Sequence, residues 1–257
     1  MPFTEIENAI AAVARGELVI VVDDADRENE GDLIMAAEAM TPEAMAFMIR
    51  HTSGVICMPV EGPRLDELRL PLMVADNTES QRTAFTVSVD ARHGTTTGIS
   101  AADRARTVAV AIDSSKGRDE IVTPGHVFPL VARDGGVLVR AGHTEACCDL
   151  ARLAGFEPAA VLCEIMKDDG TMARLPDLLQ FAAEHKLKIG TIADLIEYRS
   201  RNESLVQRAS ERQIDTPWGK FNMVSYRDLA VGALHIALRL GKIQKKNDTK
   251  EKTKTSM

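Results

Sequence analysis

The stretch of residues 23–32 carries six carboxylates and one arginine. It follows the all-apolar run 18–22 and precedes a second apolar run, 33–37, and each run is typical of a buried strand. Carboxylates gathered at the ends of buried strands repel one another unless protons or a cation neutralise them. Because oxygen ligands suit Mg²⁺ or Ca²⁺, the pattern predicts a divalent-cation site. A solvated acidic turn is an equally good explanation of the same residues.

A second chemical stretch, residues 140–145, predicts a turn from a strand into a helix, with Thr144 as the expected helix cap. Amide N–H groups at a helix start bind phosphate, and Arg140 adds a bidentate donor. His143 beside this turn could ligate a metal or transfer a proton. Taken alone, the motif is equally compatible with an ordinary capped turn.

Four weaker candidates are spread along the chain. Glu164 lies in the apolar run 160–165, where an ionised carboxylate needs a partner, so it is either a general acid or base or a glutamate on an exposed strand face. His126 follows Pro-Gly, and a lone histidine is more often structural than catalytic. Residues 95–100 predict a second anion site or a plain capped turn, and Cys57 by default is a small buried hydrophobe.

Composition narrows the function further. The 257 residues, 45% of them hydrophobic, suffice for one large domain. The net charge is −7, although residues 242–257 carry six lysines against two acids, so the remaining body is acidic, which argues against a nucleic-acid partner. No apolar run approaches the roughly 20 residues of a membrane span, and we expect no export signal. Four cysteines without metal-ligand spacing fit the cytoplasm.

Apolar runs alternate with helical periodicity up to residue 201, which predicts an α+β fold, layered as an α/β sandwich. We expect a capping box of Thr4 and Glu7 at the first helix, a helix cap at Ser100, and a hairpin over residues 127–139.

Beyond residue 201 polar residues dominate, with a weak helical pattern over residues 229–240. We therefore divide the chain into domain 1–201, segment 202–241 and a Lys-rich tail 242–257 that is expected to be disordered.

Five motifs in order resemble one known family: DDADRENEGDL (23–33), HTSGVIC (51–57), TGIS (97–100), PGHVFPL (124–130) and RAGHTEA (140–146). The series closely resembles 3,4-dihydroxy-2-butanone 4-phosphate synthase of riboflavin biosynthesis. The resemblance implies a lyase that converts D-ribulose 5-phosphate into L-3,4-dihydroxy-2-butanone 4-phosphate and formate. It also implies Mg²⁺, with Mn²⁺ as the alternative ion, and a homodimer whose sites borrow residues from the partner subunit.

The resemblance implies roles for individual residues as well. Glu28 and His143 are expected to bind metal. The expected catalytic residues are His126 and Glu164, essential to turnover, and Asp23, Glu30 and Cys57, which line the site. The expected substrate contacts are Arg27, Glu28, Asp32, Arg140, Ala141, Gly142, His143, Thr144 and Glu164, with the phosphate on Arg140 and Thr144.

Residues 216–221 and 235–238 resemble the opening of GTP cyclohydrolase II, which is fused to the synthase in bifunctional enzymes. That enzyme needs a cysteine-ligated zinc, and no cysteine follows Cys163, so we expect no cyclohydrolase activity. Two alternatives stand beside the synthase: a sugar-phosphate-binding homologue that has lost turnover, and a scaffold role in which the lysines of residues 245–254 meet an acidic partner.

Overall fold

The computed structural model describes residues 3–229 and 232–241. The chain divides into two compact units, Met1–Glu203 and Ser204–Met257. The sequence-based boundary was placed at residue 201. The predicted Lys-rich tail lies outside the described residues.

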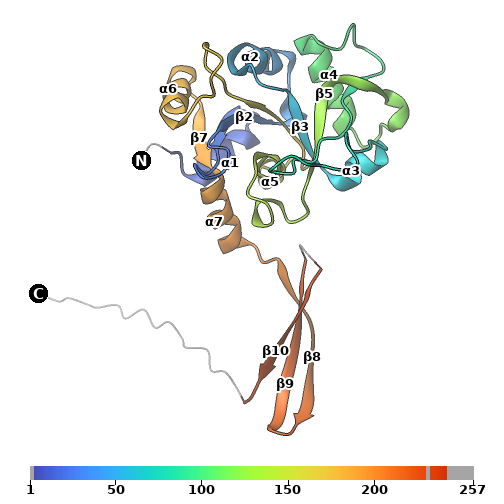
Figure 1. The fold of residues 1–257 in the computed structure, drawn as a ribbon, viewed down its shortest axis with the longest axis vertical. Coiled ribbons are helices and arrows are strands. Elements are labelled where there is room, and N and C mark those ends of the chain that lie inside the picture. Colours follow the sequence, from blue (N-terminus) through green and yellow to red (C-terminus); the bar gives the residue numbers. More distant parts are fainter. Residues whose placement is uncertain (1–2, 230–231, 242–257) are drawn as a thin grey trace, which may run out of the picture. The chain divides into compact units, whose positions relative to one another are not determined.

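The first unit is built on a mixed sheet, which is seven-stranded within the described residues and ordered β4-β5-β3-β6-β2-β1-β7 (Figure 1). The strands β3 and β5 and the strands β1 and β7 pair in parallel, whereas the other neighbours are antiparallel. The strand bounds are β1 Val19–Val22, β2 Gly31–Ala36, β3 Cys57–Glu61, β4 Val89–Ala91, β5 Ile121–Ala132, β6 Ala160–Glu164 and β7 Lys188–Thr191.

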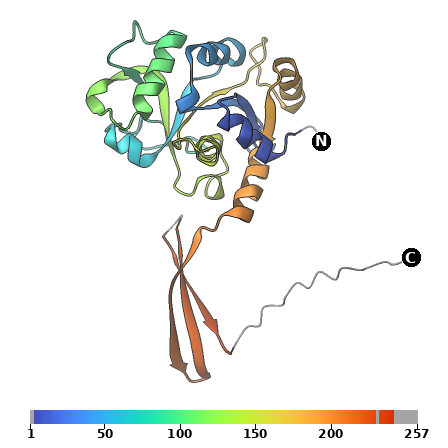
Figure 2. The same ribbon diagram turned by 180° about the vertical axis from the view of Figure 1, so that it is seen from behind.

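Helices cover both faces of this sheet (Figures 1 and 2). In β1, Ile20 packs with the core that contains α2, α4 and α6, whereas Val19 and Val21 pack with α1, α5 and α7. All four β1 residues are buried because both faces are covered, and the predicted α+β sandwich is confirmed. The helix bounds are α1 Ile6–Ala14, α2 Pro42–Thr52, α3 Gly62–Glu67, α4 Ala101–Ile112, α5 His143–Leu153, α6 Leu175–His185 and α7 Ile192–Asn202, with 3-10 turns at Ala37–Ala39, Arg118–Glu120 and Gly136–Leu138.

No helix in the described part of the chain has both the length and the apolar character needed to cross a bilayer.

Of the two helix caps predicted at Ser100 and at Thr4, the structure confirms only the first. Ser100 caps α4 by accepting the N–H of Asp103, as predicted. The capping box of Thr4 and Glu7 is wrong, because α1 follows Glu5 and no side chain caps it.

The hairpin predicted over residues 127–139 is also wrong. After β5 the chain forms a 3-10 turn at Gly136–Leu138 instead of a returning strand. Asp149 of α5 accepts the N–H of Val137 at 2.8 Å, and a Cβ at Gly136 would lie 2.3 Å from that carboxylate. The turn is therefore fixed by a contact with a helix, which local sequence does not encode.

The second unit is an antiparallel sheet of β8 Val206–Thr216, β9 Gly219–Asp228 and β10 Leu234–Arg239, in the order β10-β9-β8. The weak helix predicted over residues 229–240 is wrong, because residues 234–239 of it form β10. The apolar residues Leu234, Ile236 and Leu238 alternate with His235, Ala237 and Arg239, which is the period of a strand.

A buried ion pair ties α7 to α5 and to the turn before it. Arg199 donates to Asp149 at 2.7 Å and to the carbonyl of Gly135 at 2.9 Å, and the side chains of Arg199 and Asp149 are 3% and 5% exposed. Glu203 forms the outer half of the same cluster.

We predict that Asp149→Ala destabilises the fold by about 3 kcal/mol, because it leaves the Arg199 guanidinium buried with less compensation. Urea unfolding measures this, and Asp169→Ala, which removes an exposed carboxylate, serves as the matched control. A loss below about 1 kcal/mol would show that the pair contributes no more than a surface ion pair.

Candidate active site

The acidic stretch forms the connection between β1 and β2, which pair with Val22 opposite Gly31 and Val21 opposite Asp32. Asp23 organises this connection from inside. Its fully buried carboxylate accepts the N–H groups of Glu28 and Glu30, at 3.0 and 2.8 Å, and the guanidinium of Arg27 at 3.0 Å. Asp23 is therefore a support of the loop, with most of its acceptor capacity already used.

Arg174, at the start of α6, holds the same connection from outside. Its guanidinium donates to the carbonyl of Glu28 at 3.0 Å and also to the carbonyl of Asn29. Asn29 has a φ of 55°, a conformation that asparagine tolerates better than most residues. These contacts fix the backbone of the loop, so the Glu28 carboxylate has a defined position.

Strand register brings three predicted residues to one face of the sheet. Asp32 of β2 lies opposite Glu164 of β6, and Cys57 of β3 lies opposite Leu162 of β6. Since side chains alternate along a strand, Asp32, Glu164 and Cys57 point to the same face. Glu164 is held by the N–H of Val55, which donates to its Oε2 at 3.0 Å.

The start of α5 lies above this face and contributes His143 and Thr144. Nε2 of His143 lies 3.1 Å from the carbonyl oxygen of Val21, which can only accept, so Nε2 carries a proton. Nδ1 points the other way and lies 3.8 Å from carboxylate oxygens of both Glu28 and Asp32. The sheet thus orients the ring so that Nδ1 faces the acidic residues.

Thr144 does not cap α5, contrary to the prediction. The N-cap is Gly142, and no side chain caps the helix. The amide groups of the first turn therefore lack a side-chain acceptor, which suits an anionic ligand.

Arg140 stands beside this helix start and is already held on two sides. Its Nη1 donates to the buried carboxylate of Glu145 at 2.6 Å. Its Nη2 donates to the hydroxyl of Thr83 at 3.0 Å and to the carbonyl of Gln81 at 3.2 Å. This arrangement orients the guanidinium and links it to a distant loop.

These side chains surround a cavity of about 210 Å³. Nine predicted residues line it, namely Arg27, Glu28, Glu30, Asp32, Cys57, Arg140, His143, Thr144 and Glu164. Asp23 and Ala141 line the neighbouring cavity on the other side of the loop, and Gly142 caps α5. His126 lines neither of these two cavities.

Sequence reasoning missed Glu79, Thr83 and Phe85, which also line the cavity. Residues 61–83 have no clear hydrophobic period, so nothing in the sequence indicates that Glu79 and Thr83 reach the site. Glu79 folds this loop by accepting the N–H groups of Gln81 and Thr83. The contact of Thr83 with Arg140, 57 residues away, is what brings the loop to the site.

Electrostatics couple the ionisable groups of the cavity. The pairing with His143 lowers the pKa of Glu28 to about 2, against the opposing effect of burial. Burial opposes a charge on His143, but Asp32, Glu28 and Asp23 outweigh it and raise the pKa of His143 to about 9. Burial, assisted by nearby carboxylates, raises the pKa of Asp32 to about 7 and also raises the pKa of Glu30. Burial likewise raises the pKa of the Cys57 thiol, which stays neutral.

The donor set fits a divalent cation. One ligand atom from each of Asp23, Glu28 and His143 lies within 4.8 Å of the others. Asp23 already accepts three hydrogen bonds, so Glu28 and His143 Nδ1 are the two groups with free coordinating capacity. Without a cation, the proton on His143 provides positive charge among the carboxylates. A bound cation would replace that proton and provide the charge itself.

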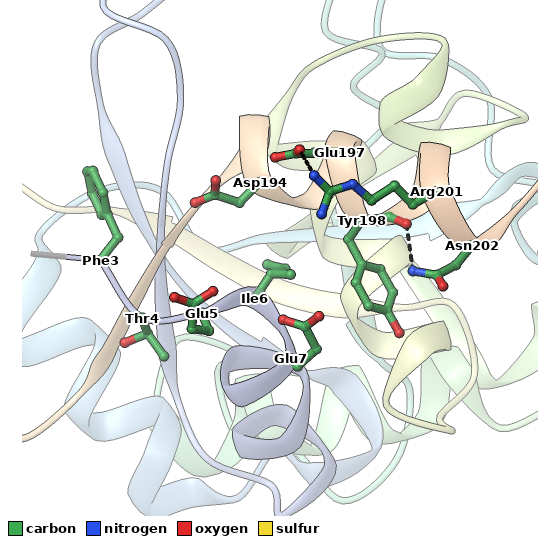
Figure 3. Close-up of a pocket in the computed structure, with 10 residues that line it drawn as sticks. All are labelled: Phe3, Thr4, Glu5, Ile6, Glu7, Asp194, Glu197, Tyr198, Arg201 and Asn202. Atoms are coloured by element: carbon green, nitrogen blue, oxygen red, sulfur yellow. Dashed lines mark hydrogen bonds and ion pairs between the residues drawn. The ribbon is translucent and has the colours of Figure 1, made fainter. Parts of the chain in front are cut away.

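A separate cavity of about 270 Å³ lies between the start of α1 and α7 (Figure 3). Glu5, Glu7 and Asp194 line it, and Glu197 pairs there with Arg201. It contains none of the residues predicted for the site.

Residues 7–198 match the family described as 3,4-dihydroxy-2-butanone 4-phosphate synthase. The chain belongs to this family. A synthase of that name from Pseudomonas aeruginosa is 55% identical over 243 residues, which are 95% of this chain and 67% of that protein. The riboflavin biosynthesis protein RibBA of Aquifex aeolicus is 56% identical over 93% of this chain and 59% of its own length. The chain thus spans about two thirds of the length of these relatives.

Solved structures of the synthase family agree with the fold. RibBX of A. baumannii, a two-domain 3,4-dihydroxy-2-butanone 4-phosphate synthase, matches with a TM-score of 0.85 and 50% identity over 93% of this chain and 70% of its own. A synthase structure in complex with two magnesium ions matches with a TM-score of 0.74 and 46% identity, over 77% of this chain and 98% of its own. The alternative of an inactive sugar-phosphate-binding homologue gains no support from these relatives.

We predict that cation binding at pH 7.5 releases about one proton, because His143, with its pKa of about 9, is protonated until Nδ1 becomes a ligand. Apparent affinity should therefore rise about tenfold per pH unit towards pH 9. Calorimetric titration with Mg²⁺ in buffers of different ionisation enthalpy measures the release, and His143→Asn is the control. Binding without proton release would place the cation elsewhere.

Proposed function

We propose that this chain converts D-ribulose 5-phosphate into L-3,4-dihydroxy-2-butanone 4-phosphate and formate, as its family resemblance implies. One observation supports the proposal: Glu28 and His143, Arg140 with the start of α5, and several carboxylates line the same small cavity. Glu28 and His143 would hold the cation. Arg140 and the start of α5 would bind the phosphate.

The chemistry is a rearrangement in which atoms balance without an oxidant. The proton on C3 is removed, the C1 hydroxyl leaves as water, the carbon skeleton rearranges, and hydration releases C4 as formate. A bound divalent cation would polarise the carbonyl and acidify the C3 proton.

Carboxylates and His126 are the candidates for the proton transfers. Asp32 has a pKa of about 7, so it can accept and return a proton near neutral pH. Glu164 lies opposite Asp32 in the sheet and is anchored by the N–H of Val55. We propose that both groups take part in the proton transfers.

The test is formate release from ribulose 5-phosphate by the purified chain, with Mg²⁺ and then with EDTA. Formate that disappears with EDTA is the expected result. A folded protein that binds Mg²⁺ but releases no formate would contradict the proposal.

We propose further that the enzyme is a homodimer in which His126 serves the site of the partner subunit. In support, His126 does not line the cavity of its own chain, and its side chain is 39% exposed. The family resemblance implies that each site borrows residues from the partner subunit, without naming His126.

Mixing two inactive variants, Glu28→Gln and His126→Asn, tests this sharing. In a mixed dimer one site carries both substitutions and the other carries none. If subunits exchange freely, formate release should recover to about one quarter of wild type, since half the dimers are mixed and half their sites are intact. No recovery after verified subunit exchange would place His126 in the site of its own chain.

Arg140→Ala should raise KM about 10- to 100-fold with a smaller change in kcat, because a charge-assisted hydrogen bond to the phosphate is lost. Arg140→Lys keeps the positive charge but loses the bidentate guanidinium, so its KM should lie between those of the wild type and Arg140→Ala. Steady-state kinetics measure both. An unchanged KM would move the phosphate seat elsewhere.

For the second unit, we propose that residues 202–241 are related to the start of GTP cyclohydrolase II, since residues 216–221 and 235–238 resemble it. The four cysteines of the chain are all buried and free, which supports a cytoplasmic location. The acidic body supports the absence of a nucleic-acid partner.

A further inference from the structure

The side chains of His126 and Asp90 form a partly buried pair, and none of the residue roles above explains it. The carboxylate of Asp90 lies 2.8 Å from Nδ1 of His126 through Oδ2, and its Oδ1 accepts the backbone N–H of His126 at 3.0 Å. An ionised carboxylate only accepts hydrogen bonds. Nδ1 therefore carries the proton of the neutral ring, and Nε2 is left free to accept one.

A break in the sheet creates this pair. The strands β4 and β5 pair with Val89 opposite Val127, but the register shifts so that Asp90 lies opposite Val122. The extra residues of β5 form a bulge, and such bulges redirect side chains. Gly125 allows it, because a Cβ there would lie 2.0 Å from the backbone of Val89.

A neighbouring loop closes over the pair. A Cβ at Gly98 would lie 2.1 Å from Oδ2 of Asp90 and 2.6 Å from Nδ1 of His126. Asp103 fixes this loop by accepting the N–H and hydroxyl of Thr96, at 3.0 and 2.7 Å, and the N–H of Gly98 at 3.0 Å. Asp103 occupies these donors and Ser100 caps α4, so residues 95–100 contain the predicted capped turn.

We propose that Asp90 is a positioning residue for catalysis: it holds His126 in the Nδ1-protonated form and keeps Nε2 ready to accept or return the substrate's proton. The inference rests on the proposed function, in which His126 takes part in turnover. Asp90 is 10% exposed at its side chain, whereas the His126 ring is 39% exposed. The carboxylate is thus shielded on the side of Nδ1, and the ring still has an open side.

A purely structural role for Asp90 is the competing explanation, because Oδ1 alone could secure the bulge through the backbone N–H of His126. Asp90→Asn separates the two roles. Asparagine has the same shape and keeps an oxygen for the backbone N–H, but it presents an N–H group to Nδ1. The neutral ring should then carry its proton on Nε2 and lose its free acceptor.

The first measurement is the tautomer of His126 in the full wild-type chain, by ¹⁵N NMR of the ring at a pH where the ring is neutral. Protonated Nδ1 is the expected result. Protonated Nε2 would overturn the proposal, whatever the variants do.

The second measurement is formate release by Asp90→Asn. We expect kcat to fall about 10²- to 10⁴-fold, as for other histidines whose tautomer is reversed, with KM within about threefold of wild type and the ¹⁵N signature inverted. Asp113→Asn, at an exposed turn beside Ser115, is the control and should match wild type. An inverted tautomer with unchanged kcat would overturn the proposal.

Different results would contradict the proposed function and the proposed role of Asp90. A wild-type chain that releases no formate contradicts the proposed function. A wild-type chain that turns over, with an Asp90→Asn variant that is equally fast, contradicts only the role of Asp90.

Discussion

The crowding of negative charge in one small cavity is the constraint on which the rest of the site depends. Glu28, Glu30, Asp32 and Glu164 share about 210 Å³ with the ring of His143. Asp32 is 3% exposed, and burial together with its neighbours raises its pKa to about 7. Such a cluster persists only if protons or a positive charge neutralise part of it. A protonated His143 supplies positive charge, and a divalent cation bound to Glu28 and Nδ1 of His143 would supply it in its place.

The scaffold is arranged to hold these charges at fixed positions. The Asp23 carboxylate and the Arg174 guanidinium secure the loop that carries Glu28. The carbonyl of Val21, on a strand buried on both faces, turns the His143 ring. Because these supports come from β1, α6 and α5, the site requires the complete layered fold of the first unit.

Some local signals in the sequence were sufficient, although the helix caps predicted at Thr4 and Thr144 were wrong. The acidic stretch was recognisable because two apolar strands enclose it, and strand alternation then fixes where Asp32 points. Contacts between distant segments were not predictable: Thr83 reaches Arg140, Asp90 reaches His126, and Asp149 replaces a hairpin with a turn. The strand β10 was mistaken for a helix although its alternation was present, since polar neighbours weakened the pattern.

We propose that the cation binds between the Glu28 carboxylate and Nδ1 of His143. Anomalous diffraction from crystals of the full chain soaked with Mn²⁺ locates the ion. We expect a peak within bonding distance of the Glu28 carboxylate and of Nδ1 of His143, with Nε2 still hydrogen-bonded to the Val21 carbonyl. A peak elsewhere, or a His143 ring turned away from the ion, would contradict it.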